Sequence, residues 1–341
     1  MGKKIKIIIP YFGKFPSTIK PFLHSCKFNP DFEWLIFTDD TTISDIPQNV
    51  KMISCTLADI KTRFEDVCGF PVALDRPYKI CDFRPAFGLA FSDYLTDCDF
   101  WGWGDIDLVY GDLHRFITDG ILEQYDKIFP CGHLSLIRND EQVNHAFMKE
   151  IKGTLDYRDV FADSKSFIFD EYKGLNEKLL ALGKRVYGAI DFADMDVVFE
   201  RFRTADKYTI SMVFPAFPFK KGIPRNYKNQ VFFWEDGKAF RAYINPKGSI
   251  SFEELAYIHY RHKIPCEIEP EKGFYVSNKG FIDKTEDIKL PDFQHYNPYP
   301  GSKTELVEFA RFTKERAAMK MGSNKKACNF IRIIKGKEPL K

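Results

Sequence analysis

The pattern of apolar and polar residues predicts strands that alternate with helices in the first third of the chain. Residues 5–9 form a nearly continuous β-branched run, typical of a strand buried on both faces, and Pro10 is expected to end it. Two further strands are predicted at residues 33–38 and 50–55. Helical spacing of apolar residues, with Gly69 at one helix end, predicts helices at three places: residues 18–26, 57–67 and 84–95.

A fourth strand is predicted at residues 100–109, an aromatic segment that is interrupted by glycines and carries acids near its end. Trp101 and Trp103 alternate along it, so both should project to one face, and at least one should pack in the core. Three strand–helix steps within roughly 100 residues favour an α/β fold with a mostly parallel sheet and flanking helices.

The rest of the chain is less regular. Apolar runs predict two strands and two helices: strands at 127–130 and 134–138, and helices at 141–151 and 175–182. Residues 230–234 and 238–244 flank a turn that contains Gly237, which is typical of a hairpin because glycine accepts a positive φ. The pattern of residues 252–260 fits either a helix or a strand.

Composition narrows the class of protein. The chain has 341 residues, of which 44% are hydrophobic and 29% charged, as in an ordinary globular protein. Its formal net charge of +2 argues against a nucleic-acid coat protein, and we expect no nucleic-acid partner. No apolar run is as long as a membrane span or a signal-peptide core, and the eight cysteines form no C-x-x-C pair. We therefore expect reduced thiols and a cytoplasmic location.

Two carboxylates stand near the end of the predicted strand at 100–109. Asp105 and Asp107 are two residues apart, and in open α/β sheets ligands bind at the carboxyl ends of the strands. Such a pair can bind one divalent ion, and oxygen ligands suit Mg²⁺ or Mn²⁺, which would neutralise a leaving diphosphate. The same spacing recurs, without a strongly apolar segment before it, at two pairs that we expect to be solvated loop acids: Asp97/Asp99 and Asp194/Asp196.

Basic and acidic residues cluster upstream of this strand. Lys79 and Arg84 can bind phosphate, and Asp82 can accept hydrogen bonds from ribose or sugar hydroxyls. Their spacing fits a capped, charged first helical turn equally well. Further along, His259 follows an apolar segment and can bind Mn²⁺, although a lone histidine is more often structural.

A second acidic pair is a candidate for catalysis. Asp170 and Glu171 follow the apolar, strand-like residues 167–169. One of these carboxylates can act as general base on an acceptor hydroxyl in an inverting transfer, or stabilise positive charge on the sugar ring in a retaining transfer. The structural alternative is an acid pair that begins a helix, where the helix dipole favours negative charge.

The chain resembles the nucleotide-sugar glycosyltransferases of the GT-A fold, and more closely a bacterial group found among capsular polysaccharide and lipopolysaccharide O-antigen enzymes, often classed as a domain of unknown function. The matching segments span roughly residues 4–265: Ile7 to Gly13, Phe37 to Asp39, Tyr78 to Gly88, Trp101 to Asp107, Gly132 to Asn139, and His259 with Lys263. The chain lacks a G-x-G-x-x-G motif after its first strand, which disfavours a Rossmann oxidoreductase.

The resemblance implies roles for individual residues. Those implied to contact the nucleotide are Pro10, Tyr11 and Phe12 against the base, Thr38 and Asp39 near the base or ribose, and Lys263 on phosphate. Those implied to lie nearer the sugars and the metal are Lys79, Asp82 and Arg84 at the ribose and donor sugar, Gly132 and His133 at the donor sugar or acceptor, Asp105 and Asp107 on the metal–diphosphate, and His259 as the remaining metal ligand.

We therefore expect a metal-dependent glycosyltransferase of GT-A-like, mixed α/β fold over residues 1–312. Its nucleotide-binding half should occupy about residues 1–130 and its acceptor half about residues 131–312. The enzyme would move a sugar from a UDP-sugar to a hydroxyl of a glycan or lipid-linked saccharide in surface polysaccharide synthesis. Two alternatives stay open: a nucleotidyl- or phosphotransferase, which can also pair acids on an α/β sheet, and a non-catalytic carbohydrate-binding protein of the same fold.

The last residues, 313–341, differ from the rest in charge. They carry a formal charge of +7, against −5 for residues 1–312. Because apolar residues interleave with the basic ones, this tail suits an anionic membrane surface, and a solvated tail is the alternative. Lipid binding would place the protein peripherally on the inner face of the cytoplasmic membrane.

Overall fold

The structure of the chain is a computed structural model that describes residues 2–196, 201–204, 226–261 and 264–301, together with 306, 307 and 310. One compact unit spans Met1–Asn297 and a second spans Pro298–Lys341. The helices and strands named below lie in the first unit. No helix in the described parts of the chain is long and apolar enough to cross a membrane. The predicted domain boundary at residue 312 falls outside the described ranges and stays a prediction.

A seven-stranded mixed sheet forms the centre of the first unit. Its strands are β1 (Ile5–Tyr11), β2 (Phe32–Thr38), β3 (Val50–Ser54), β4 (Phe100–Gly104), β6 (Lys127–Ile128), β7 (Leu134–Arg138) and β8 (Val186–Tyr187). They follow the order β3-β2-β1-β4-β7-β6-β8. Neighbouring strands run parallel except at β7, which is antiparallel to both β4 and β6. The predicted α/β class, with a mixed but mostly parallel sheet, is therefore confirmed.

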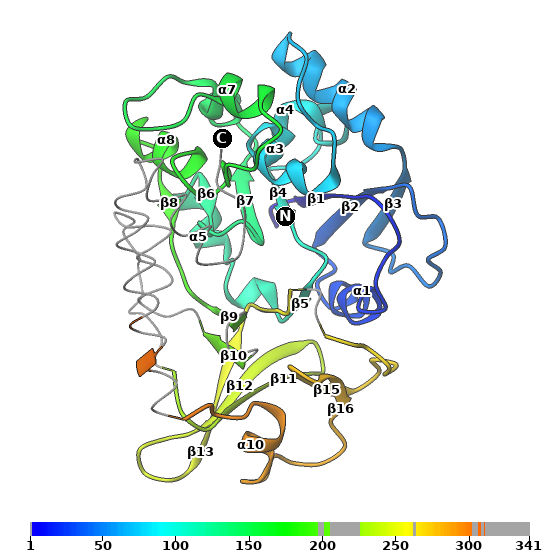
Figure 1. Ribbon diagram of the computed structural model, residues 1–341, viewed down its shortest axis with the longest axis vertical. Helices are drawn as coiled ribbons and strands as arrows, with labels where there is room; N and C mark the ends of the chain where they lie inside the picture. The colour runs from blue at the N-terminus through cyan, green and yellow to red at the C-terminus, as the bar shows by residue number, and fades with distance from the viewer. Residues whose placement is uncertain are drawn as a thin grey trace. The chain divides into compact units, whose positions relative to one another are not determined.

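Helices pack against this sheet and, in the case of the last one, against a smaller sheet that follows it in the chain. The α-helices are α1 (Ile19–Lys27), α2 (Leu57–Cys68), α3 (Ile80–Phe83), α4 (Phe87–Ala90), α5 (Asp119–Gln124), α6 (Glu141–Asn144), α7 (Tyr157–Ala162), α8 (Leu175–Ala181) and α10 (Asp292–Tyr296). Short 3₁₀ turns are η1 (Pro77–Lys79), η2 (Arg84–Ala86), η3 (Ser92–Tyr94), η4 (Leu113–Arg115) and η5 (Ala146–Met148). Figure 1 shows α2, α3, α4, α7 and α8 on one side of the sheet, and α1 with the later strands on the other.

Two smaller sheets follow. One contains β5 (Leu108–Tyr110), β9 (Phe192–Asp196), β10 (Arg201–Thr204) and β14 (Tyr257–His259), in the order β10-β9-β14-β5. The other contains β11 (Gln230–Glu235), β12 (Lys238–Ile244), β13 (Ile250–Leu255), β15 (Gly273–Ser277) and β16 (Gly280–Asp283), in the order β13-β12-β11-β15-β16. Since β5 comes directly after β4 in the chain, the turn between them connects the main sheet to the four-stranded sheet.

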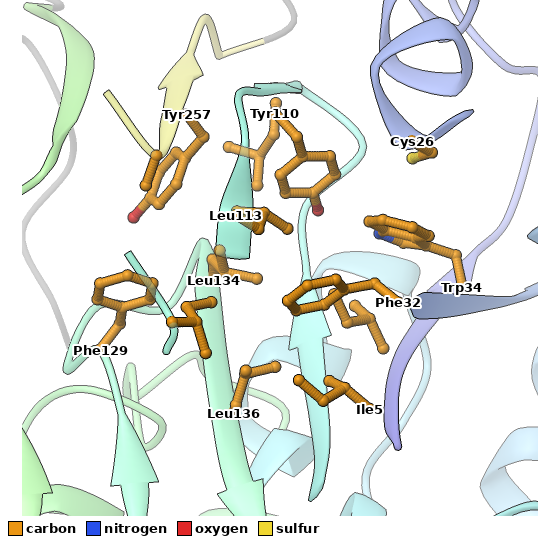
Figure 2. Packing of buried hydrophobic residues seen from close by; sticks show 14 of the residues in the cluster. Ile5, Cys26, Phe32, Trp34, Tyr110, Leu113, Phe129, Leu134, Leu136 and Tyr257 are labelled. Carbon is orange, nitrogen blue, oxygen red and sulfur yellow. The ribbon is translucent and has the colours of Figure 1, made fainter. Parts of the chain in front are cut away.

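Apolar side chains pack on both faces of the main sheet, because successive residues of a strand point to opposite faces. Ile7 and Ile9 of β1 belong to the cluster on the α1 side, whereas Ile8 belongs to the cluster under α2 and α4. Figure 2 shows part of the first cluster, in which Trp34 and Tyr110 lie together with their ring centroids 5.4 Å apart. Burial on both faces explains why β1 reads as a continuous apolar run.

Several elements agree with the sequence-based expectations. Trp101 and Trp103 lie in the same cluster and are both fully buried, so both serve the core. Helix α2 is capped at its N-terminus by Thr56, whose hydroxyl accepts a hydrogen bond from the backbone N–H of Asp59, and at its C-terminus by Gly69, with φ of 73°. The hairpin β11–β12 turns at Gly237, where φ is 83°.

Other expectations are wrong or are now decided. The predicted helix at 84–95 is three short turns, η2, α4 and η3, and the one at 141–151 is α6 and η5. Apolar spacing indicates which side chains are buried, but it does not show whether a helix continues, because most helical stability comes from tertiary packing. Residues 167–169 form a loop instead of a strand, and 252–260 belong to β13 and β14.

Candidate functional site

The turn between β4 and β5 carries the two acids of the D-x-D motif. The backbone N–H of Asp105 donates to the carbonyl of His133 on the neighbouring segment, at 3.0 Å. The carbonyl of Asp107 accepts from the N–H of Tyr260 at 2.9 Å. The side chain of Asp107 is buried, and that of Asp105 is partly exposed. Both carboxylates are thus fixed at the carboxyl end of a central strand, where ligands bind in open α/β sheets.

His259 is brought to this turn by strand register. In β14 it lies opposite Leu108 of β5 on one side and opposite Asp194 of β9 on the other. Its Nε2 is 3.5 Å from Asp107 Oδ1, and its Nδ1 is 2.9 Å from Asp194 Oδ1. Asp107 and His259 are 152 positions apart in the chain, and one pair of antiparallel strands brings them together.

Asp105, Asp107 and His259 form a cluster that can hold a metal ion. One ligand atom from each residue lies within 4.8 Å of the others. Two carboxylates and one imidazole suit Mn²⁺, and the carboxylates suit Mg²⁺. The structure thus brings together the three residues that the sequence proposes as metal ligands, and their donor set fits such an ion.

The carboxylates of Asp107 and Asp194 change the pKa of His259, and the imidazole of His259 in turn changes the pKa of Asp194. Burial disfavours a charged imidazole, but the carboxylates of Asp107 and Asp194 outweigh this effect and raise the pKa of His259 to about 10. Burial alone would raise the pKa of Asp194, but His259 and Arg261 outweigh it and hold that pKa below its usual range. Arg261 donates to Asp194 Oδ1 from Nε at 2.9 Å and to Oδ2 from Nη2 at 2.5 Å.

Asp194 corrects one sequence-based expectation. From the sequence we expect Asp194 and Asp196 to be solvated loop acids, but both lie within strand β9. Asp194 pairs with His259 and Arg261, and Asp196 pairs with Arg203. The alternation of residues 192–196, with Ala193 and Met195 buried on one face, is the signal that indicates a strand. By contrast, Asp97 and Asp99 lie at the surface in ion pairs with lysines, as expected of solvated acids.

Arg84 connects the D-x-D turn to the second acidic pair. It begins η2 and is mostly buried; its Nη2 donates to Asp105, and its Nη1 donates to Asp170 Oδ2 at 2.8 Å and to the carbonyl of Gly132 at 2.8 Å. Burial opposes the cation, yet Asp105 and Asp170 outweigh it and raise the pKa of Arg84 well above its usual range. The guanidinium therefore holds three segments of the chain around one charge.

Asp170 and Glu171 lie together beside Gly132. The backbone N–H of Gly132 donates to Glu171 Oε1. Burial, followed by the charge of Asp170, raises the pKa of Glu171 to about 7, and burial also raises the pKa of Asp170 despite the opposing effect of Arg84. Asp170 Oδ1 is buried and has no hydrogen-bond partner among the residues that the structure describes. Neither acid begins a helix, because α8 starts at Leu175.

A side chain at Gly132 would push against the acidic pair. A Cβ atom there would lie 2.6 Å from Asp170 Oδ2 and 2.9 Å from Glu171 Oε1, much closer than side chains normally approach. The next residue, His133, stacks its ring on that of His259 with centroids 4.7 Å apart. Burial and the neighbouring His259 hold the pKa of His133 well below its usual range, so it is neutral. Its Nδ1 is 2.9 Å from the hydroxyl of Tyr257.

Lys79 and Asp82 lie behind the site and not on its wall. Both side chains are fully buried, and they pair with each other at 2.9 Å. This placement differs from the expectation that they face a ribose or a sugar, because no surface of either side chain is open to a ligand. Arg84, the third member of the group, is the one that reaches Asp105.

The residues implied to hold the nucleotide lie along one edge of the main sheet. Tyr11 ends β1 opposite Thr38 at the end of β2, and Pro10 and Tyr11 are half-buried. Asp39 is exposed, and its carboxylate accepts from the N–H of Gly13 at 2.8 Å. Phe12 is buried in the core, away from solvent. Lys263 and the basic tail lie outside the described residues.

Fold and site together define an α/β protein with an acidic, histidine-containing cluster at the carboxyl ends of its strands. Residues 7–285 match the Family of unknown function (DUF6625). Because this match covers most of the chain, the protein belongs to that family. No curated protein matches the chain.

Some solved structures are weakly similar to the chain. The galactosyltransferase LgtC in complex with donor and acceptor sugar analogues has a TM-score of 0.31 at 12% identity, over 55% of this chain and 75% of LgtC. An active-site mutant of LgtC has a TM-score of 0.36 at 12% identity, over 75% and 87%. A mycobacterial protein has a TM-score of 0.29 at 12% identity, over 76% and 85%. Because these TM-scores are low, the function proposed below rests on the chain's own residues.

Proposed function

We propose that this protein is a metal-dependent glycosyltransferase that moves a sugar from a UDP-sugar to a hydroxyl of a glycan or lipid-linked acceptor in bacterial surface polysaccharide synthesis. The observation that carries the proposal is the convergence of Asp105, Asp107 and His259 within 4.8 Å at the strand ends, with a second acidic pair held next to them by Arg84. The resemblance of the sequence motifs to GT-A-fold transferases supports the choice of a UDP-sugar.

The proposed reaction exchanges one bond at the anomeric carbon for another. The acceptor hydroxyl oxygen forms a bond to that carbon, the bond to the UDP oxygen breaks, and UDP leaves with the electron pair. Mn²⁺ or Mg²⁺ held by Asp105, Asp107 and His259 would supply positive charge against the diphosphate. Lys263 stays a proposed phosphate contact. Positive charge near the leaving group lowers the barrier because it stabilises the negative charge that develops on the leaving UDP oxygen.

The acidic pair supplies the proton chemistry in this proposal. Glu171, whose pKa is raised to about 7, is suited to take the proton of the acceptor hydroxyl near neutral pH in an inverting transfer. Asp170 is held by Arg84 through Oδ2 and its side chain is buried, so in this proposal it contributes negative charge beside Glu171 and makes no direct contact with the sugar. In a retaining transfer the same two carboxylates would stabilise positive charge on the sugar ring.

UDP binding and UDP release test the proposal together. We expect calorimetry to show UDP binding that requires Mn²⁺, and incubation with UDP-sugars and Mn²⁺ to release free UDP. Consumption of nucleoside triphosphates without UDP release would favour a nucleotidyl- or phosphotransferase instead. Sugar binding without metal-dependent UDP binding would favour a carbohydrate-binding protein.

Substitutions at the D-x-D turn locate the activity. Asp105→Asn and Asp107→Asn should each lower turnover by about 100-fold or more, because each removes a proposed ligand of the metal ion whose positive charge would stabilise the leaving diphosphate. Asp97→Asn is the matched control, since it changes the surface D-x-D pair and should leave turnover unchanged. Wild-type turnover in both D-x-D variants would overturn the metal assignment.

A further inference from the structure

Lys79 and Asp82 form an ion pair in the interior of the protein. Lys79 Nζ is 2.9 Å from Asp82 Oδ2, and neither side chain has any exposed surface. Residues three apart share one face of a helical turn, which brings the two charges together at the junction of η1 and α3. Burying two charges costs free energy, and an apolar pair of similar volume often stabilises a protein as well or better. Stability alone is therefore a weak reason for this pair.

The other polar contacts of the pair are made to a single segment of the chain. Lys79 Nζ donates to the carbonyl of Val160 at 2.8 Å and to that of Lys165 at 2.5 Å. Asp82 accepts from the N–H of Phe167, at 3.1 Å through Oδ1 and 3.0 Å through Oδ2, and from the N–H of Phe169 at 3.0 Å. All three donors of the ammonium group are used. The pair thus substitutes for the backbone partners that this loop, which belongs to no sheet, would otherwise lack.

These contacts shape the backbone that leads into the acidic pair. Asp82 binds the N–H groups on both sides of Ile168, and Ile168 has a φ of 58° with its side chain half exposed. A positive φ is unfavourable for a β-branched residue and persists only where the surroundings impose it. The N–H of Glu171 then donates to the carbonyl of Ile168 at 3.0 Å. The backbone conformation at Ile168 therefore determines the position of the Glu171 backbone.

The same short stretch of chain also holds the acidic side chains. Arg84 follows Asp82 by two residues, and its guanidinium binds Asp170 and Asp105. Residues 79–84 thus bind the loop twice, once through its backbone at 165–169 and once through the carboxylate of Asp170. Arg84 reaches the site itself, whereas Lys79 and Asp82 act from behind it.

We propose that Lys79 and Asp82 are positioning residues, which fix residues 165–171 so that Asp170 and Glu171 face the Asp105–Asp107 turn. The catalytic part of this inference rests on the proposed glycosyltransferase function. The positioning part concerns the chain's own backbone and can be measured without any activity. A displacement of about 1 Å in a group that holds reacting atoms can lower a rate by about 100-fold, so the pair has a large effect on turnover without touching a ligand.

The test replaces the pair with apolar residues in the full chain. The Lys79→Met/Asp82→Leu double variant removes both charges together, so that neither is left buried alone. The matched control is Arg138→Met/Asp126→Leu, which removes an ion pair at the opposite end of β4. There Arg138 also donates to backbone carbonyls, of Leu122 at 2.6 Å and of Tyr125 at 2.9 Å.

Hydrogen exchange and kinetics are then read in parallel. In the Lys79/Asp82 variant we expect exchange of the amides at 165–171 to rise by at least about tenfold, and kcat to fall by about 100-fold with UDP–Mn²⁺ affinity within about threefold of wild type. The control should leave exchange at 165–171 and kcat at wild-type values. Lys79→Gln/Asp82→Asn, which keeps an acceptor oxygen at position 82 and leaves no buried charge, should give intermediate effects, and it serves as the readout if the apolar double variant does not fold.

Each outcome decides a different point. Unchanged exchange at 165–171 in both the apolar double variant and Lys79→Gln/Asp82→Asn overturns the inference. Raised exchange with wild-type kcat also overturns it, because the loop would then be held without consequence for the reaction. If the wild-type protein releases no UDP from any donor, the proposed function fails, while raised exchange still supports the positioning of this loop.

Discussion

Glu171 sets the pH dependence that we expect at the level of a single residue. Burial and the charge of Asp170 raise its pKa to about 7. Because only the ionised carboxylate accepts a proton, turnover should be full above this pH and fall as the pH drops below it. A profile of kcat against pH measures this step. Glu171→Gln should show low turnover at every pH, and a variant that keeps wild-type turnover would exclude Glu171 as the base.

The same pKa shift also makes the stability of the protein depend on pH. Its contribution to stability falls as the pH rises, whereas turnover increases. A glutamate ordinarily titrates near 4.5, so the folded protein binds this proton more tightly than the unfolded chain does. The stabilisation from protonated Glu171 is complete below 4.5 and is lost as the pH rises through about 7. Glu171→Gln removes this loss, so its Tm relative to wild type should increase from about pH 5 to pH 8. A constant difference in Tm would contradict the shift.

Asp194 should act on the metal through His259. Its carboxylate lies 2.9 Å from His259 Nδ1 and so orients the imidazole toward Asp107. Partners of this kind typically change metal affinity by about 10- to 100-fold, and we expect Asp194→Asn to weaken Mn²⁺ binding by that factor. Calorimetric titration with Mn²⁺ measures the effect. The control is Asp196→Asn, because Asp196 lies on the same strand as Asp194 but pairs with Arg203 of β10; this variant should bind Mn²⁺ like wild type.

At the level of elements, the loop between β6 and β7 lets two carboxylates approach the backbone. Gly132→Ala would place a Cβ 2.6 Å from Asp170 Oδ2, so the acidic pair must move. We expect a loss of about 1–3 kcal/mol of stability, as for other overpacked sites, together with a large fall in kcat. Chemical denaturation and turnover measure the two effects. Gly120→Ala in α5, where no atom lies closer than 4.0 Å, is the control and should be neutral or stabilising.

Elements differ in how far local residues specify them. Helix α2 has its own capping residues at Thr56 and Asp59 and its own glycine end, so its boundaries follow from nearby sequence. The turns η2, α4 and η3 have no such boundaries in the sequence pattern. Their residues are buried where helical spacing predicts, but the chain stops each turn after three or four residues as it follows the surface of the sheet. Local signals therefore predict the first kind of element well and the second only by its burial.

At the scale of the whole molecule, charge is divided between body and tail. Residues 313–341 carry +7 and residues 1–312 carry −5. If the tail binds anionic lipid, the full-length variant Lys325→Gln/Lys326→Gln/Arg332→Gln/Lys335→Gln should lose most of its binding to phosphatidylserine vesicles, at about 1 kcal/mol per charge. Vesicle sedimentation measures this loss. UDP release should be unchanged, and vesicle binding equal to wild type would exclude the tail as the contact.

The sequence by itself determines the α/β class, the strand that leads into Asp105 and Asp107, and the set of candidate ligands; the turn that separates β4 from β5 at these two acids is seen only in the structure. These follow from local pattern, because burial on two faces and acids after an apolar run are visible within about ten residues. The tertiary structure alone decides which distant residues meet. Strand register places Asp194 behind His259, and a buried ion pair places Lys79 and Asp82 behind the site instead of in it. Register and burial depend on contacts between segments far apart in the chain, so no local pattern can specify them.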